Sequence, residues 1–172
     1  MVMTFPERAP RLIVSDIDGT LLDRNHRVPK RNREVIARAV NAGAEFALAT
    51  GRPFRWIMPV LEQLTVRPVC VTSNGAVIYD SAEDRVLSTH ELSPEALAET
   101  VNVASRALQP LGGAGFGAER AGGSLLDPVD ELFVVESHYS ENAMFEGFGL
   151  VSVGELVSQP AVKLLILSLI HI

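Results

Sequence analysis

The chain has 172 residues, of which 47% are hydrophobic and 21% are charged, and its formal net charge is −6. This composition can build one folded core and a small second unit, and it excludes a chain that is disordered throughout. The acidic balance argues against a nucleic-acid partner. A basic cluster at Lys30, Arg31 and Arg33 falls on an expected helix, and we interpret it as a solvated face.

The cysteine content and the chain ends restrict the class of protein further. The single cysteine, Cys70, lies in an apolar run, so we expect a buried thiol and no disulfide. The N-terminal residues contain no long apolar segment after a basic start, and the apolar C-terminal stretch KLLILSLIHI is shorter than the roughly 20 residues of a membrane span. We therefore expect a cytoplasmic protein without a membrane anchor.

The first half of the chain alternates strand and helix patterns. Residues 11–15 (RLIVS) form a continuous apolar run, which is typical of a parallel strand covered on both faces. A helix is expected after Pro29, with Gly43 at its C-terminal end. Residues 45–50 (EFALAT) predict a second strand, and Pro59 predicts that the next helix is kinked or starts late.

A third strand at residues 68–73 (PVCVTS) completes a β-α-β-α-β series, which predicts a parallel sheet with right-handed crossovers. Residues 76–80 and 85–89 then resemble a hairpin, and Ser93 followed by Pro94 is expected to cap a helix.

The composition and the pattern of predicted elements change after the hairpin. Glycines are dense from residue 112 to 123, and the strand-like segments 132–137 and 162–167 have no βαβ rhythm. The GAGFGA segment (113–118) satisfies a dinucleotide-binding pattern, but a helix precedes it instead of a strand, so we expect a flexible or bulged strand. We divide the chain into an α/β core at residues 1–83 and an α+β unit at residues 84–166.

Two aspartates follow the first strand. Asp16 and Asp18 are two residues apart, and neighbouring like charges coexist most easily when a cation lies between them or when one carboxyl holds a proton. Mg²⁺ prefers such oxygen ligands, which indicates metal-assisted chemistry on an anion. The alternative is a turn in which the aspartates cap the next segment.

The ends of the second and third strands are also polar. The second strand leads into Thr50, Gly51 and Arg52 at the start of a helix, and the third leads into Ser73 and the pair Asn74-Gly75. Each segment alone is typical of a turn or an N-cap. Because parallel strands end at one edge of a sheet, the three segments are expected to converge on one crevice that can hold a phosphate or a carboxylate.

The segments DIDGTLLD, LATGRP and SNGA resemble the haloacid dehalogenase (HAD) superfamily, in particular its Cof-type sugar-phosphatase-like branch. The resemblance implies an α/β, Rossmann-like parallel core, here incomplete, with an inserted α+β cap that selects a small phosphorylated metabolite. It implies that Asp16 is the nucleophile and Asp18 the acid/base. Thr50, Gly51, Arg52, Asn74 and Gly75 would bind the phosphate or the substrate, and the Asp16 carboxylate and Asp18 main-chain carbonyl would hold Mg²⁺.

The chain departs from this branch at its C-terminal end. The lysine and the acidic loop that the branch carries after the cap are absent, so the first strand should be left on an exposed apolar edge, and we expect little or no turnover by these residues alone. The last six residues, LSLIHI, resemble the translation of a transposon-end adapter used in sequencing libraries. Residues 167–172 are thus a candidate non-native tail, and the alternative is an authentic apolar strand.

The function that we expect is Mg²⁺-dependent hydrolysis of small phosphate esters through an aspartyl phosphate. Two alternatives stay open at this point. One is a receiver-like signalling domain whose aspartate accepts a phosphoryl group, and the other is a HAD-type phosphomutase.

Overall fold

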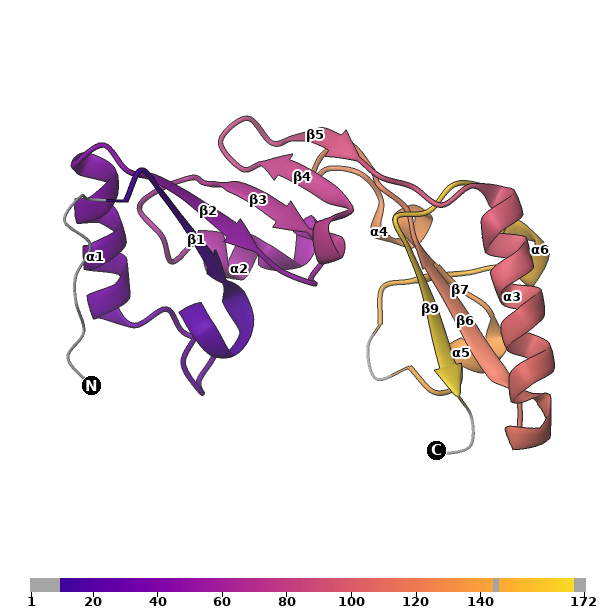
Figure 1. Ribbon diagram of the computed structural model, residues 1–172. Coiled ribbons are helices and arrows are strands. Elements are labelled where there is room, and N and C mark those ends of the chain that lie inside the picture. The colour runs from indigo at the N-terminus through magenta and orange to yellow at the C-terminus, as the bar shows by residue number, and fades with distance from the viewer. Residues whose placement is uncertain (1–9, 144–145, 169–172) are drawn as a thin grey trace. The chain divides into compact units, whose positions relative to one another are not determined.

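The computed structural model describes residues 10–143 and 146–168. The chain divides into two compact units, Met1–Leu87 and Ser88–Ile172 (Figure 1). This division falls a few residues beyond residue 83, where the sequence suggested the end of the core. In the part of the chain that the structure describes, no helix is both long enough and apolar enough to cross a membrane.

The first unit contains a five-stranded sheet in the order β1-β2-β3-β4-β5. Its strands are β1 (Leu12–Asp16), β2 (Glu45–Ala49), β3 (Val69–Thr72), β4 (Val77–Asp80) and β5 (Arg85–Thr89). The pairs β1–β2 and β2–β3 are parallel, and β4 runs antiparallel to β3. The expected β-α-β-α-β series and the hairpin are therefore confirmed.

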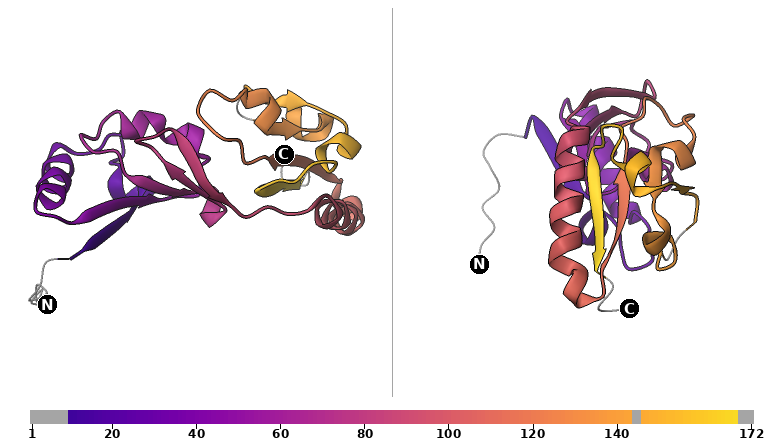
Figure 2. Two further views of the ribbon diagram at one scale, coloured as in Figure 1. Left: turned by 90° about the horizontal axis from the view of Figure 1, so that it is seen from above. Right: turned by 90° about the vertical axis from the view of Figure 1, so that its right-hand side faces the viewer.

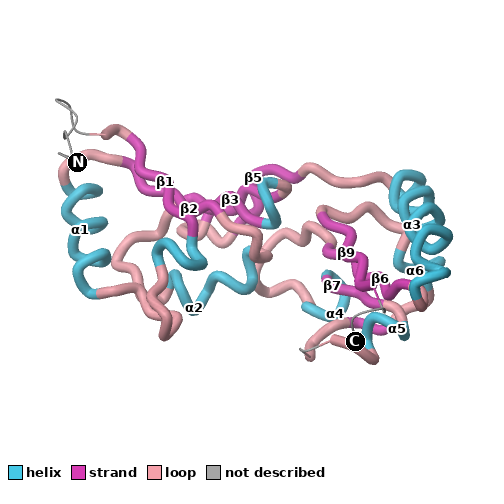
Figure 3. The backbone as a smooth tube through the Cα atoms, turned by 60° about the horizontal axis from the view of Figure 1, so that its bottom comes forward, coloured by secondary structure: helices cyan, strands magenta, loops and turns pink. Residues whose placement is uncertain are grey.

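Two helices connect the parallel strands. Helix α1 (Lys30–Asn41) ends before Gly43, whose φ of 94° lies in the left-handed region that favours glycine. Helix α2 (Met58–Leu61) follows a 3₁₀ turn and carries Pro59 in its first turn, which confirms the expected late start. Figure 3 shows α1 and α2 on the same side of the strands.

The two faces of this sheet differ in burial. Phe46, Leu48 and Cys70 lie buried on the face that carries the helices, whereas Leu12 is 53% and Val14 is 55% exposed on the other face. The expectation that the first strand is covered on both faces is therefore wrong. Two right-handed crossovers that step in the same direction along the sheet would place both helices on one face in this way. Strand β1 also forms an edge of the sheet, as expected.

The second unit contains a four-stranded sheet in the order β8-β7-β6-β9. Its strands are β6 (Ala114–Glu119), β7 (Phe133–Val135), β8 (Gly149–Leu150) and β9 (Lys163–Ser168). The glycine-rich segment is the central strand β6, antiparallel to both β7 and β9, which excludes the dinucleotide-binding interpretation. Leu167 and Ser168 of the candidate tail end β9, and residues 169–172 lie outside the described residues.

Helices cover both faces of this second sheet. Helix α3 (Pro94–Leu108) is capped by the Ser93 side chain and packs with α6 (Val153–Leu156) on one face, while α5 (Ser137–Ser140) packs on the other. A further short helix, α4 (Val129–Leu132), leads into β7. The right-hand view of Figure 2 shows α3 on one side of the yellow strand β9 and the orange segments on the other.

Candidate active site

The chain turns sharply where β1 ends. Asp16 is the last residue of β1, Ile17 is fully buried, and Asp18 is again exposed, so the buried isoleucine holds the two aspartates at the surface of the first unit. Gly19 has a φ of 76°, a backbone conformation that favours glycine, and it directs the chain away from the strand. Exposed and buried residues alternate from Asp16 to Asp18, and Gly19 then adopts a left-handed conformation, so the local structure accounts for the DxDG pattern.

Arg52 binds the Asp18 carboxylate with two hydrogen bonds. Its Nε donates to Oδ2 at 2.7 Å and its Nη2 donates to Oδ1 at 2.5 Å. The hydrogen bonds from Arg52 are the main reason that the pKa of Asp18 is lowered from its usual value of 3.8. In this arrangement Asp18 is ionised and its charge is balanced.

The turns after β2 and β3 are joined by backbone hydrogen bonds. Asn74 N donates to Thr50 O at 3.2 Å, and Ser73 N donates to Arg52 O at 2.9 Å. The Thr50 hydroxyl, which is nearly buried, accepts a hydrogen bond from Arg52 N at 3.1 Å. These bonds hold the two turns as one polar surface beside Asp18.

Gly51 lies close to the end of the Asn74 side chain. A Cβ atom at position 51 would lie 2.6 Å from Asn74 Oδ1, closer than carbon and oxygen can pack. Ser73 and Asn74 themselves have left-handed φ values of 51° and 59°, and Gly75 follows with a φ of 96°. Such a run of unfavourable backbone conformations is typical of functional turns.

Of the residues that the sequence suggested, Asp18, Thr50, Gly51, Arg52 and Asn74 are joined by hydrogen bonds or close contacts, and Gly75 completes the third turn. Asp16 reaches this group through the sheet register, because it pairs with Ala49, the residue directly before Thr50. Among the described residues, the Asp16 side chain makes no hydrogen bond or ion pair, so its carboxylate is available to a ligand.

The residues present fit part of a magnesium site. An uncommitted carboxylate at Asp16 and the main-chain carbonyl of Asp18 are hard oxygen donors, and Mg²⁺ commonly uses one or two carboxylates and fills its remaining positions with water. In residues 10–143 and 146–168 there is no cluster of three or more His, Cys, Asp and Glu side chains that could hold a metal. The described residues therefore offer only a few protein ligands for the ion, and Mg²⁺ can fill its remaining positions with water.

Sequence reasoning missed two features next to Asp18. One is the Asp18–Arg52 ion pair, which the convergence of two polar strand ends could have suggested. The other is a pocket of about 570 Å³ between Asp18 and the loop that follows Leu22. It is lined by Asp18, Gly19, Leu22, Asp23, Arg24 and His26.

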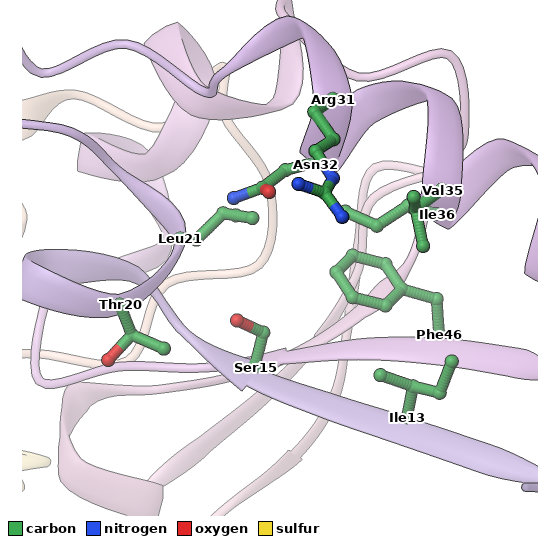
Figure 4. Close-up of a pocket in the computed structure, with 9 residues that line it drawn as sticks. All are labelled: Ile13, Ser15, Thr20, Leu21, Arg31, Asn32, Val35, Ile36 and Phe46. Carbon is green, nitrogen blue, oxygen red and sulfur yellow. The ribbon is translucent and has the colours of Figure 1, made fainter. Parts of the chain in front are cut away.

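A different pocket, of about 370 Å³, lies between β1 and α1 and contains none of the expected site residues. Figure 4 shows aliphatic and aromatic side chains around it, with Arg31 and Asn32 projecting from α1. Ser15, Thr20, Arg31 and Asn32 are the polar residues of its lining, and the other five lining residues are apolar.

Comparison with known proteins identifies the family. The family model for haloacid dehalogenase-like hydrolases matches residues 13–111, more than half of the chain. The HMP-PP phosphatase of Serratia proteamaculans is 33% identical over 79 residues, which are 46% of this chain and 29% of that protein. The phosphatase YwpJ of Bacillus subtilis is 37% identical over 70 residues, 41% of this chain and 25% of that protein.

Solved structures share the fold. TM0651 from Thermotoga maritima superposes with a TM-score of 0.64 at 23% identity, over 91% of this chain and 56% of that one. SMU.1108c from Streptococcus mutans gives a TM-score of 0.68 at 19% identity, over 91% of this chain and 56% of that one. The chain spans about half the length of these structures, and its matches cover less than a third of the curated relatives. The chain belongs to the haloacid dehalogenase-like hydrolase family and has its Rossmann-like α/β fold.

Proposed function

We propose that this chain carries part of the catalytic apparatus of a cytoplasmic, Mg²⁺-dependent phosphatase that acts on small phosphate esters. One observation carries the proposal: the Asp18 carboxylate at the end of β1 is held by Arg52 from the turn after β2, beside Thr50 and Asn74. Carboxylates, a hydroxyl and a guanidinium meet at the edge of the sheet where α/β proteins bind phosphate.

In the proposed reaction, an Asp16 carboxylate oxygen attacks phosphorus, and the bond between phosphorus and the alcohol oxygen breaks. Asp18 gives its proton to the departing alcohol oxygen. Asp18 then accepts a proton from a water molecule, which attacks the aspartyl phosphate and releases inorganic phosphate and free Asp16. The Thr50 hydroxyl and the Gly51 amide would orient the phosphoryl oxygens.

Arg52 has to change partners in this scheme. While it binds Asp18, the lowered pKa keeps that carboxyl ionised, and an ionised carboxyl cannot donate a proton. A phosphate group carries more charge than a carboxylate, so we infer that a bound ester draws Arg52 away and lets Asp18 take up a proton. A magnesium ion, when bound at Asp16 and the Asp18 carbonyl, would supply neutralising charge for the phosphoryl oxygens.

We assign the second unit as a cap module that selects the substrate. Its α+β sheet begins directly after the β4–β5 hairpin, where the resemblance to the Cof-type branch expects a cap. Relatives whose names state a substrate include the HMP-PP phosphatase and a 5-amino-6-(5-phospho-D-ribitylamino)uracil phosphatase, YwtE of Bacillus subtilis, 35% identical over 86 residues. On this basis the substrate is a small phosphorylated metabolite.

The test compares the chain with its Asp16→Asn variant by two measurements. Hydrolysis of p-nitrophenyl phosphate is followed with and without Mg²⁺, and formation of a fluoroberyllate adduct is followed by ¹⁹F NMR. We expect weak turnover at most, but a Mg²⁺-dependent adduct on the unmodified chain and none on Asp16→Asn. The adduct needs no turnover, because fluoroberyllate mimics a phosphoryl group attached to a carboxylate.

Asp130→Asn is the matched control, because Asp130 is an exposed aspartate on α4 in the second unit. It should form the adduct as the unmodified chain does. Equal adduct formation by Asp16→Asn and the unmodified chain, or an adduct on neither, would remove Asp16 from the role of nucleophile.

A further inference from the structure

The loop Asp23–Arg27 forms one wall of the 570 Å³ pocket beside Asp18. We propose that this pocket is a subsite for a second anionic group on the substrate, a carboxylate or a second phosphate on the alcohol part, and that Arg24 and His26 recognise it. This inference rests on the proposed phosphatase function and narrows its substrate class.

The pocket lies where the role proposed for Asp18 would place the alcohol part of the substrate. The alcohol oxygen that leaves phosphorus must lie within hydrogen-bonding distance of the residue that protonates it. Asp18 and Gly19 line the pocket directly, so the carbon skeleton attached to that oxygen can extend along it. Arg24 and His26 line the same pocket, so the far end of a short alcohol that extends along it can meet their side chains.

The loop is held in a fixed conformation by one side chain. Asp23 Oδ1 accepts hydrogen bonds from Asn25 N at 2.8 Å and Arg27 N at 3.0 Å. Asp23 N donates to Arg27 O at 2.9 Å, and His26 N donates to Asp23 O at 3.1 Å. A loop closed in this way presents its outward side chains without a large loss of entropy on binding.

His26 occupies a strained backbone position. Its φ is 55°, in the left-handed region that favours glycine. The strain has no packing reason in the loop, because His26 is exposed. A histidine that is kept there at a cost is consistent with a ligand role for its imidazole.

One cationic side chain of the pocket is left uncommitted, although two aspartates also line it. Asp18 is neutralised by Arg52, and Asp23 is bound by two backbone N–H groups. Arg24, by contrast, makes no side-chain hydrogen bond or ion pair with any of the described residues. An uncommitted guanidinium is suited to bidentate binding of a carboxylate or a phosphate.

The test measures equilibrium binding to the unmodified chain in the presence of Mg²⁺, by NMR titration. The ligands are glycerol 3-phosphate, 3-phosphoglycerate and glycerol 1,3-bisphosphate, which share a three-carbon skeleton and differ in the far group. We expect the two ligands with a second anionic group to bind about fivefold more tightly than glycerol 3-phosphate, and the preference to fall as salt is added.

Arg24→Gln and His26→Asn should each reduce this preference, and asparagine tolerates the left-handed backbone at position 26. Arg27→Gln is the matched control, since Arg27 lies on the same loop but does not line the pocket. Tighter binding of 3-phosphoglycerate alone would identify the second anionic group as a carboxylate. Tighter binding of glycerol 1,3-bisphosphate alone would identify it as a phosphate.

Equal binding of all three ligands by a chain that forms the Asp16 adduct would overturn the subsite and leave the phosphatase proposal intact. An unchanged preference in both Arg24→Gln and His26→Asn would also overturn it. A preference that these two variants abolish, in a chain that forms no adduct on Asp16, would support the subsite and count against the phosphatase.

Discussion

The sheet of the first unit packs helices against one face, whereas the sheet of the second unit packs them against both. In the first unit Leu12 and Val14 remain more than half exposed on the uncovered face. In the second, Phe116 and Ala118 pack under α3 and α6, while Val135 packs with Tyr139 of α5 on the opposite face. The first sheet therefore carries the candidate site at its strand ends and exposes apolar surface, and the second has a two-sided core.

Glycines make the two-sided packing possible. A Cβ atom at Gly115 would lie 2.7 Å from Tyr139 N, and one at Gly117 would contact the Val135 side chain at 3.3 Å. These bare positions on β6 let the backbone of α5 approach the sheet closely. The glycine content that made the segment difficult to interpret from sequence is thus a packing requirement.

The largest expected effect is at the glycine contact. Gly115→Ala should destabilise the second unit by about 3 kcal/mol, because the new methyl group meets backbone atoms of α5 that cannot rotate away. Gly154→Ala is the control, since its nearest neighbour would be Ser152 Oγ at 3.9 Å. Urea unfolding followed by circular dichroism measures the change, and fluorescence of Trp56 reports on the first unit. Equal effects of the two substitutions would contradict the close-approach explanation.

The same valine substitution on the two sheets tests the comparison directly. Val135 is fully buried and Val14 is 55% exposed. Val135→Ala should therefore cost about 2 kcal/mol of unfolding free energy, and Val14→Ala less than about 0.5 kcal/mol. Urea denaturation of both variants provides the measurement, and a loss at Val14 as large as that at Val135 would mean that the first sheet is covered on both faces in solution.

Glu136 makes the second unit sensitive to acid. Burial alone would raise its pKa, but hydrogen bonds from the backbone N–H groups of His138, Phe116 and Tyr139 lower it overall from 4.5. A carboxyl whose pKa is lower in the folded state stabilises the fold above about pH 4.5, and this contribution is lost as the pH falls through the folded value.

Glu136→Gln should cost about 1 to 2 kcal/mol at pH 7 and should flatten the dependence of stability on pH below 4.5. Thermal melts between pH 3 and pH 7 test this prediction. Glu155→Gln, at the exposed capping box of α6, is the comparison, and its effect at pH 7 should be smaller because that carboxylate lies in solvent. If the stability of Glu136→Gln depends on pH below 4.5 as strongly as that of the unmodified chain, Glu136 is not the cause of the acid sensitivity.

The smallest effect on stability is expected at the exposed edge of the first sheet. Val14→Lys should change the unfolding free energy by less than about 0.5 kcal/mol, yet it should reduce self-association, because a lysine on an apolar edge strand opposes pairing with another strand. Sedimentation velocity measures the association. Val103→Lys, at an exposed valine on α3, should leave self-association unchanged. An equal reduction of self-association by both variants would mean that net charge, and not pairing at strand β1, controls it.

The order of elements was predictable from the sequence where the signal is local. The βα alternation, Gly43 at the end of α1 and the late start at Pro59 all follow from short-range rules. The one-sided cover of the first sheet was not predicted, because it depends on the direction of both crossovers. The convergence of Asp18, Thr50 and Asn74 could be predicted from the ends of parallel strands, but the choice of Arg52 as the partner of Asp18 depends on side-chain geometry.

The contact between Gly51 and Asn74 limits how this surface can be altered. Because the two turns lie in contact, a larger residue at position 51 has to displace the Asn74 side chain, so a change in the turn after β2 also alters the turn after β3. A library that varies the segment after β2 should therefore change ligand binding through Asn74 as well, and Asn74→Gly should remove this coupled effect in a Gly51→Ala background.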